Sequence, residues 1–402
     1  MGSQRTDNER FSIVCLSSQD WRTPLPTNRQ QVMLRAARSG HSVLFVETGH
    51  FLGKHLALLV RGPHRASLAK RLFATEEGAS GVRLRKAVNL VPWGSRFRVA
   101  NVVNAALTAR LLRRLTTRMP GPVVLWIYDP GAARMAGSSG ETFVVYDCVD
   151  DYLAQTTSAN RRDHIEVYQR MLMRSADIVF ATSRTMFERL RPLNAGTHLV
   201  SNAGDYDHFA RAVDRSITDP AVEGLKRPVV GFTGNFLSSK VDFALLETIA
   251  RKGAHWTLLL IGPATAESRP ALDRLGRLPN VHWLGPKPYA DLPGYVAAFD
   301  VGLIPYVSNA YTRSCFPLKL YEYLAAGKPV VASGVPELAG MEPDVALVEG
   351  ATAFVEAVEE VLAHDGEADR IRRRTLAARN SWEAKTEQLL ELVNRELHKR
   401  PA

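Results

Sequence analysis

Short runs of apolar and β-branched residues recur along the chain and alternate with stretches whose apolar residues are spaced as on one face of a helix. Each run is bounded by Gly, Pro or Asp. Strands joined through one helix each form right-handed βαβ units and a parallel sheet, so the pattern predicts an α/β fold. The predicted strands are 12–17, 41–47, 122–128, 142–147, 176–182, 197–202, 228–234, 256–262, 281–285, 300–306 and 329–333.

A polar, irregular stretch after residue 201 divides these strands into two series. We therefore expect two doubly wound, Rossmann-like domains that face a cleft, because ligands of such sheets bind beyond the carboxyl ends of the strands. The expected parts are an acceptor-side domain at 1–205, a linker at 206–227, a second domain at 228–375, and a helix at 376–402 that packs back on the first domain. Helices are predicted at 27–40, 160–176, 239–252, 288–299 and 317–326.

The composition describes a globular protein with a sizeable core, since 46% of its 402 residues are hydrophobic and 23% are charged. No run approaches the ~20 apolar residues of a membrane-spanning helix, and the first ten residues are too polar for a secretory signal. Three distant cysteines favour a reducing compartment over a disulfide framework. We therefore expect a cytoplasmic protein.

The net charge of +10 is concentrated between His50 and Pro120, where fourteen basic residues face only two acidic ones. Apolar residues interleave with these charges, as in FLGKHLALLVRG and TARLLRRL. Such stretches suit an anionic membrane surface better than base stacking, so we expect peripheral attachment at the inner face of the membrane and no nucleic-acid partner. A soluble anionic partner and a simple solvated basic face remain alternatives.

The stretch SCFPLKLYEYLAAGKPVVAS, residues 314–333, combines a predicted helix start with two charged side chains. Pro317 suits the first helical position, and free N–H groups of a first turn favour an anion. Lys319 and Glu322 are three residues apart and share one face of the helix. A diphosphate at Lys319 with a ribose at Glu322 would satisfy these groups. The alternative is an ordinary Lys–Glu pair on an exposed turn.

A second candidate element opens the second series, where the strand PVVGFTG is followed by Asn235. Gly231 and Gly234 allow close backbone approach to a phosphate, although the run is neither a Walker loop nor a full dinucleotide fingerprint. Lys240 nearby either adds charge to this element or is only solvated. Tyr306, after the strand at 300–306, is placed either to stack on a ligand or to fill the wall of the crevice.

Three carboxylates, Asp147, Asp150 and Asp151, follow a predicted strand of the first domain in VYDCVDDY. A carboxylate close to others can have the raised pKa of a general base. The three acids are also a candidate Mg²⁺ or Mn²⁺ site. A purely structural use, with Asp151 as a helix N-cap, is the third reading.

The motifs FPLKLYEYLAAGKPVVAS, GFTGNF and VSNAGDYDHF resemble those of nucleotide-sugar-dependent glycosyltransferases of the GT-B fold. Within that family, CLSSQDWRTP and VYDCVDDY are most similar to the xanthan-type glucuronosyltransferases, and the teichuronic-acid-type transferases are similar too. The resemblance implies a donor, most simply a UDP-sugar, bound by the second domain, and an acceptor bound by the first. It implies no cofactor and no obligatory metal.

The resemblance also implies roles for individual residues. It makes Asp150 the general base and places Trp21, Arg22 and Asp151 on the acceptor side. The chain departs from the family in two places: Ser314 stands where many retaining members carry a second Glu, which argues against retention, and Pro286 replaces a carboxylate of the xanthan-type enzymes. The implied donor-binding residues are Gly234, Asn235, Tyr306, Ser314, Leu318, Lys319 and Glu322.

The expected function is therefore transfer of a sugar, with inversion, from a nucleotide diphosphate to an acceptor hydroxyl. Lys319 and a helix N-terminus would stabilise the leaving diphosphate. The acceptor is a glycan, a lipid-linked molecule or a small molecule. A nucleotide-sugar epimerase and a non-catalytic nucleotide-sugar-binding protein remain alternatives on the same fold.

Overall fold

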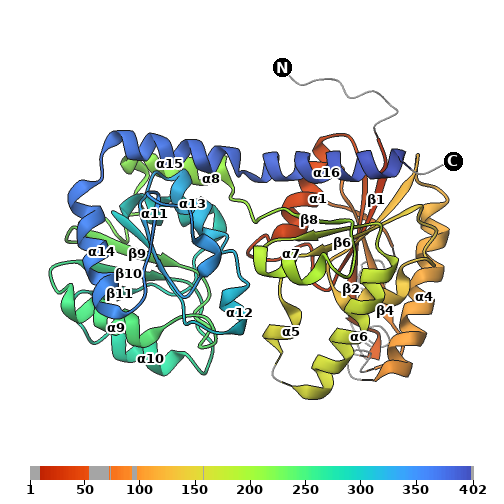
Figure 1. Ribbon diagram of the computed structural model, residues 1–402, viewed down its shortest axis with the longest axis horizontal. Coiled ribbons are helices and arrows are strands. Elements are labelled where there is room, and N and C mark those ends of the chain that lie inside the picture. Colours follow the sequence, from red (N-terminus) through yellow and green to blue (C-terminus); the bar gives the residue numbers. More distant parts are fainter. Residues whose placement is uncertain (1–9, 54–71, 73, 93–96, 157, 400–402) are drawn as a thin grey trace, which may run out of the picture. The chain divides into compact units, whose positions relative to one another are not determined.

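The computed structural model of the chain describes residues 10–399, apart from 54–71, 73, 93–96 and 157. Two compact units make up the structure. The first contains residues up to Val200 together with those from Thr386 onward, and the second runs from Ser201 to Lys385. Each unit has its own sheet with helices packed against it (Figure 1).

The sheet of the first unit has, among the described residues, eight strands in the order β3-β4-β2-β1-β5-β6-β7-β8. All neighbours are parallel except β3 and β4. The order reverses at the β1/β5 boundary, where doubly wound sheets open a crevice. The strands are β1 (Ser12–Ser17), β2 (Ser42–Phe51), β3 (Glu76–Glu77), β4 (Arg83–Asn89), β5 (Val123–Ile127), β6 (Phe143–Cys148), β7 (Ile178–Ala181) and β8 (Thr197–Leu199).

The helices of the first unit include one whose outer face is unusually apolar. α4 turns Ala105, Thr108 and Ala109 inward, and its exposed residues include Val99 and Leu107. The helices are α1 (Asn28–Arg38), α4 (Arg98–Thr116), α5 (Tyr152–Gln155), α6 (Ala159–Ser175) and α7 (Arg184–Leu190), with 3₁₀ turns η2 (Ala79–Gly81) and η3 (Pro130–Met135). None of the helices that the structure describes combines the length and apolar character that a membrane span requires.

The sheet of the second unit is parallel throughout, in the order β11-β10-β9-β12-β13-β14. Its central strands β9, β10 and β12 are buried at every position, as expected for strands with both faces covered. The order reverses between β9 and β12. The strands are β9 (Val229–Thr233), β10 (Thr257–Ile261), β11 (Val281–Trp283), β12 (Val301–Pro305), β13 (Val330–Ser333) and β14 (Val345–Leu347).

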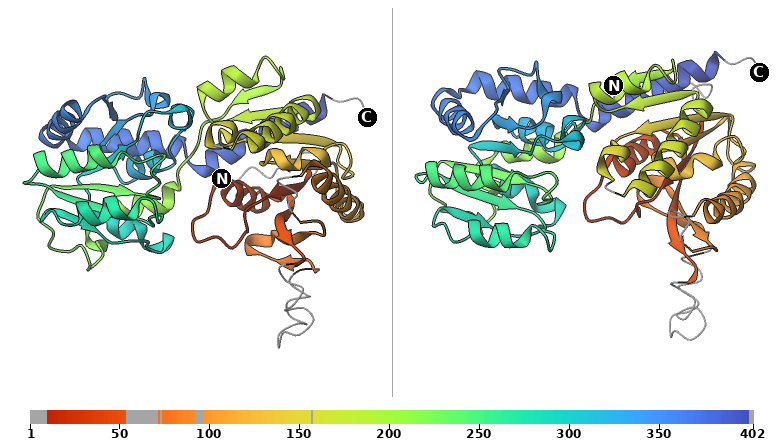
Figure 2. Two further views of the ribbon diagram at one scale, coloured as in Figure 1. Left: turned by 90° about the horizontal axis from the view of Figure 1, so that it is seen from below. Right: turned by 60° about the horizontal axis from the view of Figure 1, so that its bottom comes forward.

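Helices cover both faces of this second sheet (Figure 2). α9, α10 and α14 form one contacting group, and α8, α11, α13 and α15 form the other. The helices are α8 (Tyr206–Ala210), α9 (Phe243–Lys252), α10 (Arg269–Leu275), α11 (Leu292–Ala298), α12 (Ala310–Arg313), α13 (Lys319–Ala325), α14 (Ala351–His364) and α15 (Glu367–Arg379). The 3₁₀ turns are η4 (Arg211–Val213), η5 (Arg215–Ile217), η6 (Tyr289–Asp291) and η7 (Pro336–Leu338).

The division into units differs in detail from the expected boundaries. The expected linker at 206–227 carries α8, η4 and η5 and belongs to the second unit. The last helix, α16 (Trp382–His398), begins in the second unit and continues into the first from Thr386. Of the segment 376–402, only the part from Thr386 onward therefore groups with the first unit.

Three predicted helices begin later than the pattern suggested. The segment expected at 288–299 opens with the 3₁₀ turn η6, and α11 begins only at Leu292. The segment expected at 239–252 is helical only from Phe243, because Asp242 caps the helix by accepting from the Leu245 N–H at 2.9 Å. The segment expected at 317–326 is helical from Lys319, with Leu318 as N-cap, so Pro317 lies just before the helix. Strand β4 and helix α4 were not among the predicted elements.

Candidate functional site

The carboxyl ends of β9 and β12 bring together several of the predicted residues of the second unit. β9 ends at Thr233 and continues into Gly234, while β12 ends at Pro305 and continues into Tyr306. These two strands flank the point where the strand order reverses. Such switch points are where open α/β sheets bind ligands.

Lys319 reaches this point from the first turn of α13. Its ammonium group donates a hydrogen bond of 2.6 Å to the Tyr306 hydroxyl. It also lies 4.4 Å from the ring centroid of Phe232 and 4.9 Å from that of Tyr306, within the range of cation–π attraction. The cation is therefore held by aromatic rings at the end of the sheet, and no carboxylate forms an ion pair with it among the described residues.

α13 is fixed against the sheet by contacts on both sides of Lys319. The Tyr323 hydroxyl, fully buried, accepts from the Thr233 N–H at 2.8 Å and so ties α13 to the end of β9. Asn202, from the motif VSNAGDYDHF, donates to the Phe316 carbonyl at 2.6 Å, just before the helix. These contacts set the position of Lys319 through the backbone that carries it.

Gly234 has a backbone conformation that disfavours a side chain. Its φ of +144° is unfavourable for other residues, and a Cβ atom there would lie 2.9 Å from the Lys319 ammonium nitrogen. Gly262, after β10, was not among the predicted site residues, yet a Cβ atom there would lie 1.9 Å from the Gly234 carbonyl oxygen. The signal that could have identified it is the strand run WTLLLIG, which ends on glycine like PVVGFTG. The base of the site is therefore main chain.

Glu322 lies one turn after Lys319 on a half-buried part of α13. Burial raises the pKa of Glu322 to about 7, with the Lys319 charge opposing the shift and Asp205 adding to it. A carboxyl group with this pKa changes its charge near neutral pH. Its position and its acceptor oxygens suit hydrogen bonds from the hydroxyl groups of a ligand.

The other predicted donor residues differ in how they are placed. Asn235 is exposed beside Gly234, and Leu318 caps α13. Ser314 is buried, and its hydroxyl donates to the Tyr311 carbonyl at 3.0 Å, so it helps to end α12. Lys240 extends over the site, 5.0 Å from the Tyr306 ring centroid. The structure thus groups Gly234, Tyr306 and Lys319, while the Ser314 side chain is directed to its own helix.

The three carboxylates of the first unit point to different partners. Asp147 is buried and accepts from the Trp126 indole N–H at 3.2 Å. Asp151 is buried too, accepts from the Ala154 N–H as the N-cap of α5, and forms an ion pair of 2.7 Å with Arg189. Among the described residues, no three His, Cys, Asp or Glu side chains gather closely enough to hold a metal ion. The metal reading of these acids therefore has no cluster to support it.

Asp150 is half-buried and lies in the field of a buried arginine, Arg29. Arg29 contacts Asp129 at 3.1 Å and the Tyr152 hydroxyl at 3.0 Å. Burial alone would lower the pKa of Arg29, but Asp129, with smaller contributions from Tyr152, Tyr128 and Asp150, raises it above its ordinary value. Asp129 follows β5, so this cluster lies at the switch point of the first sheet.

Arg29 and Asp129 were not among the predicted site residues. Arg29 is 4% exposed although it is the second residue of a helix whose first turn has the polar sequence of a surface segment. The signal that could have identified Arg29 is the position of this turn, which follows the strand predicted at 12–17. Ligands of doubly wound sheets bind beyond the carboxyl ends of the strands.

The expected acceptor-side residues Trp21 and Arg22 lie after β1. The Trp21 backbone N–H donates to Glu47 at 2.8 Å, and its ring contacts Phe45 edge-on with centroids 5.0 Å apart. Arg22 is exposed and pairs with Glu76 at 3.1 Å. Arg22, Glu47 and Glu76 line a cavity of about 190 Å³, and Trp21 is not among its lining residues.

The sequence is similar to those of known glycosyltransferases. Residues 227–364 match the family described as Glycosyl transferases group 1. The chain is also 33% identical over 220 residues to TuaH of Bacillus subtilis (strain 168), which is provisionally described as a teichuronic acid biosynthesis glycosyltransferase. That match covers 52% of this chain and 54% of TuaH, so the chain spans about half the length of this curated relative.

Solved structures share the architecture over almost the whole chain. Sucrose-phosphate synthase from Thermosynechococcus elongatus superimposes with a TM-score of 0.70 at 17% identity, covering 97% of this chain and 100% of its own. Anabaena HepE in complex with UDP and glucose gives 0.65 at 17% identity, with 94% and 98% covered. A structure from Escherichia coli described as trehalose-6-phosphate bound with UDP-2-fluoro glucose superimposes with a TM-score of 0.69 at 13% identity. The match covers 96% of this chain and 99% of the other. Residues 227–364 are therefore similar to the group 1 glycosyltransferases, and the chain as a whole has the GT-B fold.

Proposed function

We propose that this protein is a glycosyltransferase that moves a sugar from a nucleotide diphosphate to an acceptor hydroxyl with inversion. The observation that carries the proposal is the position of the Lys319 ammonium beside Tyr306 and Gly234, at the switch point of the second sheet. HepE, with the same fold, is described with UDP and glucose, and the E. coli structure with a UDP-sugar analogue. A UDP-sugar is therefore the proposed donor here.

Lys319 would stabilise the negative charge that develops on the leaving diphosphate. Because α13 has only seven residues, its dipole is small, and the full charge of Lys319 is the larger contribution. The main-chain base at Gly234 lets phosphate oxygens approach closely. The tie from Tyr306 to Lys319 means that the cation need not be ordered when the donor binds.

Glu322 would accept hydrogen bonds from the ribose hydroxyls. Without a ligand, burial raises the pKa of the Glu322 carboxyl. Hydroxyl groups that donate hydrogen bonds to this carboxyl would favour its ionised form and so lower that pKa. Lys319 and Glu322 are one turn apart, which matches a diphosphate next to a ribose. Asn235, exposed beside Gly234, is placed to contact either group.

In the first unit, Asp150 would remove the proton from the acceptor hydroxyl. Asp147 and Asp151 are committed to Trp126 and Arg189, whereas Asp150 is half-buried near the Arg29 cluster. Ser314, at the position of the second Glu of retaining relatives, supports inversion because its hydroxyl is turned to its own helix. We further propose that the reaction needs no metal ion, since Lys319 supplies the positive charge at the diphosphate.

The outer face of α4 suggests where the acceptor is found. Val99 is 76% exposed, and Val102, Val103 and Leu107 are each at least 40% exposed. Arg110, Arg113 and Arg114 continue this face, and no acidic residue occurs between Gly78 and Tyr128. Apolar side chains next to arginines fit an anionic lipid surface. We therefore propose peripheral binding to an anionic membrane at the cytoplasmic side, and a lipid-linked acceptor. Residues 54–71 of the basic window lie outside the described residues.

The direct test is a screen of nucleotide sugars by thermal shift, followed by product analysis with the donor that stabilises the protein most. Transfer to an acceptor, with inverted configuration, supports the proposal. Conversion of the donor into its epimer without any acceptor would identify an epimerase. Tight binding with neither product would identify a non-catalytic binding protein, and failure of every nucleotide sugar to bind would rule out all three readings.

A further inference from the structure

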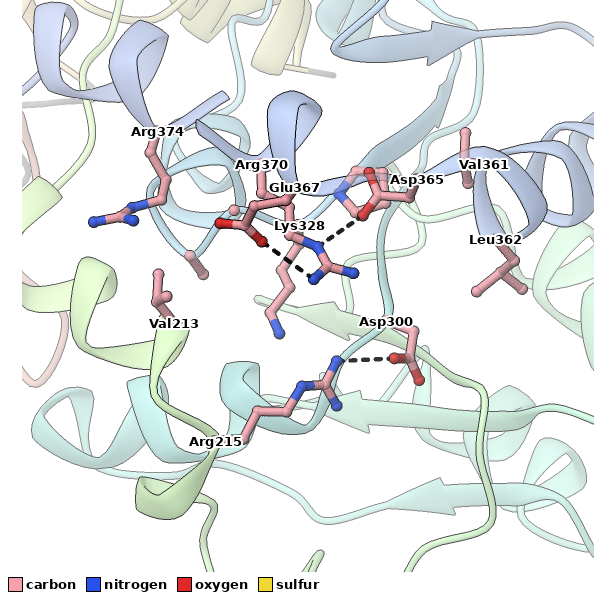
Figure 3. Close-up of a pocket in the computed structure, with 13 residues that line it drawn as sticks. Val213, Arg215, Asp300, Lys328, Val361, Leu362, Asp365, Glu367, Arg370 and Arg374 are labelled. Atoms are coloured by element: carbon pink, nitrogen blue, oxygen red, sulfur yellow. Dashed lines mark hydrogen bonds and ion pairs between the residues drawn. The ribbon is translucent and has the colours of Figure 1, made fainter. Parts of the chain in front are cut away.

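A separate cavity of the second unit lies at the amino ends of the strands, whereas Lys319 lies at their carboxyl ends. Figure 3 shows the residues that line this cavity. Asp300 directly precedes β12, and Lys328 lies two residues before β13, so both are at the amino ends of their strands. Gly234 and Tyr306 follow the carboxyl ends of parallel strands. The cavity measures about 210 Å³, room for several waters at about 30 Å³ each or for a phosphate-sized group. It is therefore distinct from the proposed donor site.

Lys328 is buried in the wall of this cavity, with 6% of its surface exposed. Its side chain points toward the space that Arg215 and Asp300 border (Figure 3). Burial, with a further contribution from Arg215, lowers the pKa of Lys328 to about 7, against the attraction of Asp300. One of its three N–H groups donates to the Ala297 carbonyl at 3.1 Å, and no other hydrogen bond joins it to the described residues. Two donors of a buried amine are thus left for another acceptor.

The charges around the cavity do not balance. Asp300 is shared between Arg215, at 3.0 Å, and Arg227. Asp365 pairs with Arg370, at 3.1 Å, and with Arg373, while Glu367 adds a contact to Arg370. Three carboxylates therefore form ion pairs with four arginines. Lys328 and Arg374 also line the cavity and add two more basic groups. The Nε atom of Arg374 is buried and has no hydrogen-bond partner among the described residues.

We propose that this cavity binds a phosphate-type oxyanion through Lys328 and Arg374. Such an anion offers several acceptor oxygens to the two remaining N–H groups of Lys328 and to the buried Arg374 Nε. It also supplies the negative charge that the lining carboxylates lack, since those are already paired with Arg215 and Arg370. Free phosphate and the phosphate ester of a small polyol share this chemistry.

A purely structural role for Lys328 accounts for part of these observations. Ala297 is close to the end of α11, and a lysine can satisfy the last carbonyls of a helix. This role uses one donor of Lys328 and leaves the buried, unpartnered Arg374 Nε without a function. The two readings differ in whether Arg374 matters to an anion.

The test is isothermal titration of the full chain with sulfate, inorganic phosphate and glycerol 3-phosphate, with saturating UDP present to compete for the donor site. Sulfate keeps its charge between pH 6 and 8, so its binding should weaken as the pH rises through about 7 and Lys328 loses its proton. We expect one binding site, with affinity at least tenfold weaker in Arg374→Gln and Lys328→Met. Arg379→Gln, an exposed position on the same helix α15, is the matched control and should bind as the parent does.

Equal affinity of the parent, Arg374→Gln and Arg379→Gln, or the absence of binding by all three anions, would overturn the proposal. If Lys328→Met fails to fold, the pair of arginine variants still decides the question. That pair is also independent of the proposed function, because it compares two positions outside the donor site. Tighter binding of inorganic phosphate would assign the free anion, and tighter binding of glycerol 3-phosphate would assign an ester.

Discussion

The ammonium of Lys319 and the hydroxyl of Tyr306 are 2.6 Å apart, although one belongs to the first turn of α13 and the other to the loop after β12. This hydrogen bond joins two segments that meet at the switch point of the sheet. It holds the cation in one place in the absence of a ligand, with the rings of Phe232 and Tyr306 beneath it. Because the ammonium group is already held in place, the Lys319 side chain loses less conformational entropy when an anion binds.

Lys319→Ala should weaken the binding of UDP. A hydrogen bond to a charged group contributes about 1.5–3 kcal/mol, which corresponds to a loss of roughly tenfold to 150-fold in affinity. The variant should fold, because Tyr323 and Asn202 still anchor α13. Calorimetry with UDP is the measurement, and Lys226→Ala, an exposed lysine of the same unit, is the control. Parental affinity in the Lys319 variant would remove this residue from the donor site.

Glu322→Gln should change how stability depends on pH. The folded-state pKa of about 7 lies above the ordinary value of 4.5, so the folded state holds this proton more firmly than the unfolded chain. Stability is therefore lost as the pH rises from about 4.5 to 7. At pH 8 the variant should be more stable than the parent by about 1–3 kcal/mol, since each pKa unit corresponds to about 1.4 kcal/mol.

Urea unfolding of Glu322→Gln and the parent at pH 5 and pH 8 measures this difference. In the same variant, UDP affinity should fall while pyrophosphate affinity stays close to the parental value, because the ribose contact alone is changed. Identical pH dependence in the two proteins would show that Glu322 titrates normally.

The positions of the strands, and the spacing that places Lys319 and Glu322 on one face of α13, follow patterns that can be recognised in the sequence. All eleven predicted strands overlap observed ones, since each has an apolar run bounded by Gly, Pro or Asp. Lys319 and Glu322 could be placed on one face because helical spacing is regular. The start of this helix could not be placed to the residue: Pro317 was expected at the first helical position, and the helix begins at Lys319 with Leu318 as N-cap.

Features that depend on tertiary packing could not be predicted from the sequence. Arg29 is charged and lies in the first turn of a helix, so nothing local distinguishes it from a surface residue. Only its partners Asp129 and Tyr152 explain its burial. Likewise, β4 carries Arg83, Arg85 and Lys86 at alternate or adjacent positions and lacks the apolar run of a central strand. Its partner β2 supplies the pairing that makes it a strand.

Asp150→Asn should lower the rate of transfer by at least about a hundredfold, the usual range for a general base. UDP affinity should be unchanged, because Asp150 belongs to the first unit and the proposed donor residues belong to the second. Asp151→Asn is the informative comparison. It keeps an N-cap acceptor, since Asn and Asp cap helices about equally well. It loses the ion pair with the half-exposed Arg189, which should cost about 1 kcal/mol in stability, with a smaller effect on rate. Turnover of the Asp150 variant near the parental value would exclude it as the base.

Transfer should continue in excess EDTA. The proposed leaving-group stabilisation comes from Lys319, and the described residues contain no cluster of metal-binding side chains. Product formation with the donor found by the thermal-shift screen is measured with and without EDTA. Loss of activity that Mg²⁺ or Mn²⁺ restores would show that a metal bridges the diphosphate.

The protein should sediment with vesicles that contain anionic lipid, more strongly as the anionic fraction rises and less strongly at high salt. Each basic residue at such a surface contributes about 1 kcal/mol, so changing Arg110, Arg113 and Arg114 to Glu should weaken binding by about a hundredfold or more. Val99→Ser and Val103→Ser should weaken it at both salt concentrations, because they remove apolar area without changing the charge.

The matched control for vesicle binding is the triple change of Arg161, Arg162 and Arg174 to Glu, three exposed arginines of α6. It alters the net charge equally and should leave sedimentation close to the parental level. Equal losses in the two triple variants would mean that net charge alone, rather than the face of α4, causes the attraction.

The close approach of Gly262 to the Gly234 carbonyl has a consequence for how this site can diversify. Where two backbone segments touch, there is no side chain to exchange, and a library that randomises these positions should return almost only glycine. Variation in donor preference must then arise at the margin, for example at Asn235 and Lys240, whose side chains extend beyond that contact. Attempts to alter the nucleotide or sugar accepted by this protein should begin with those two positions.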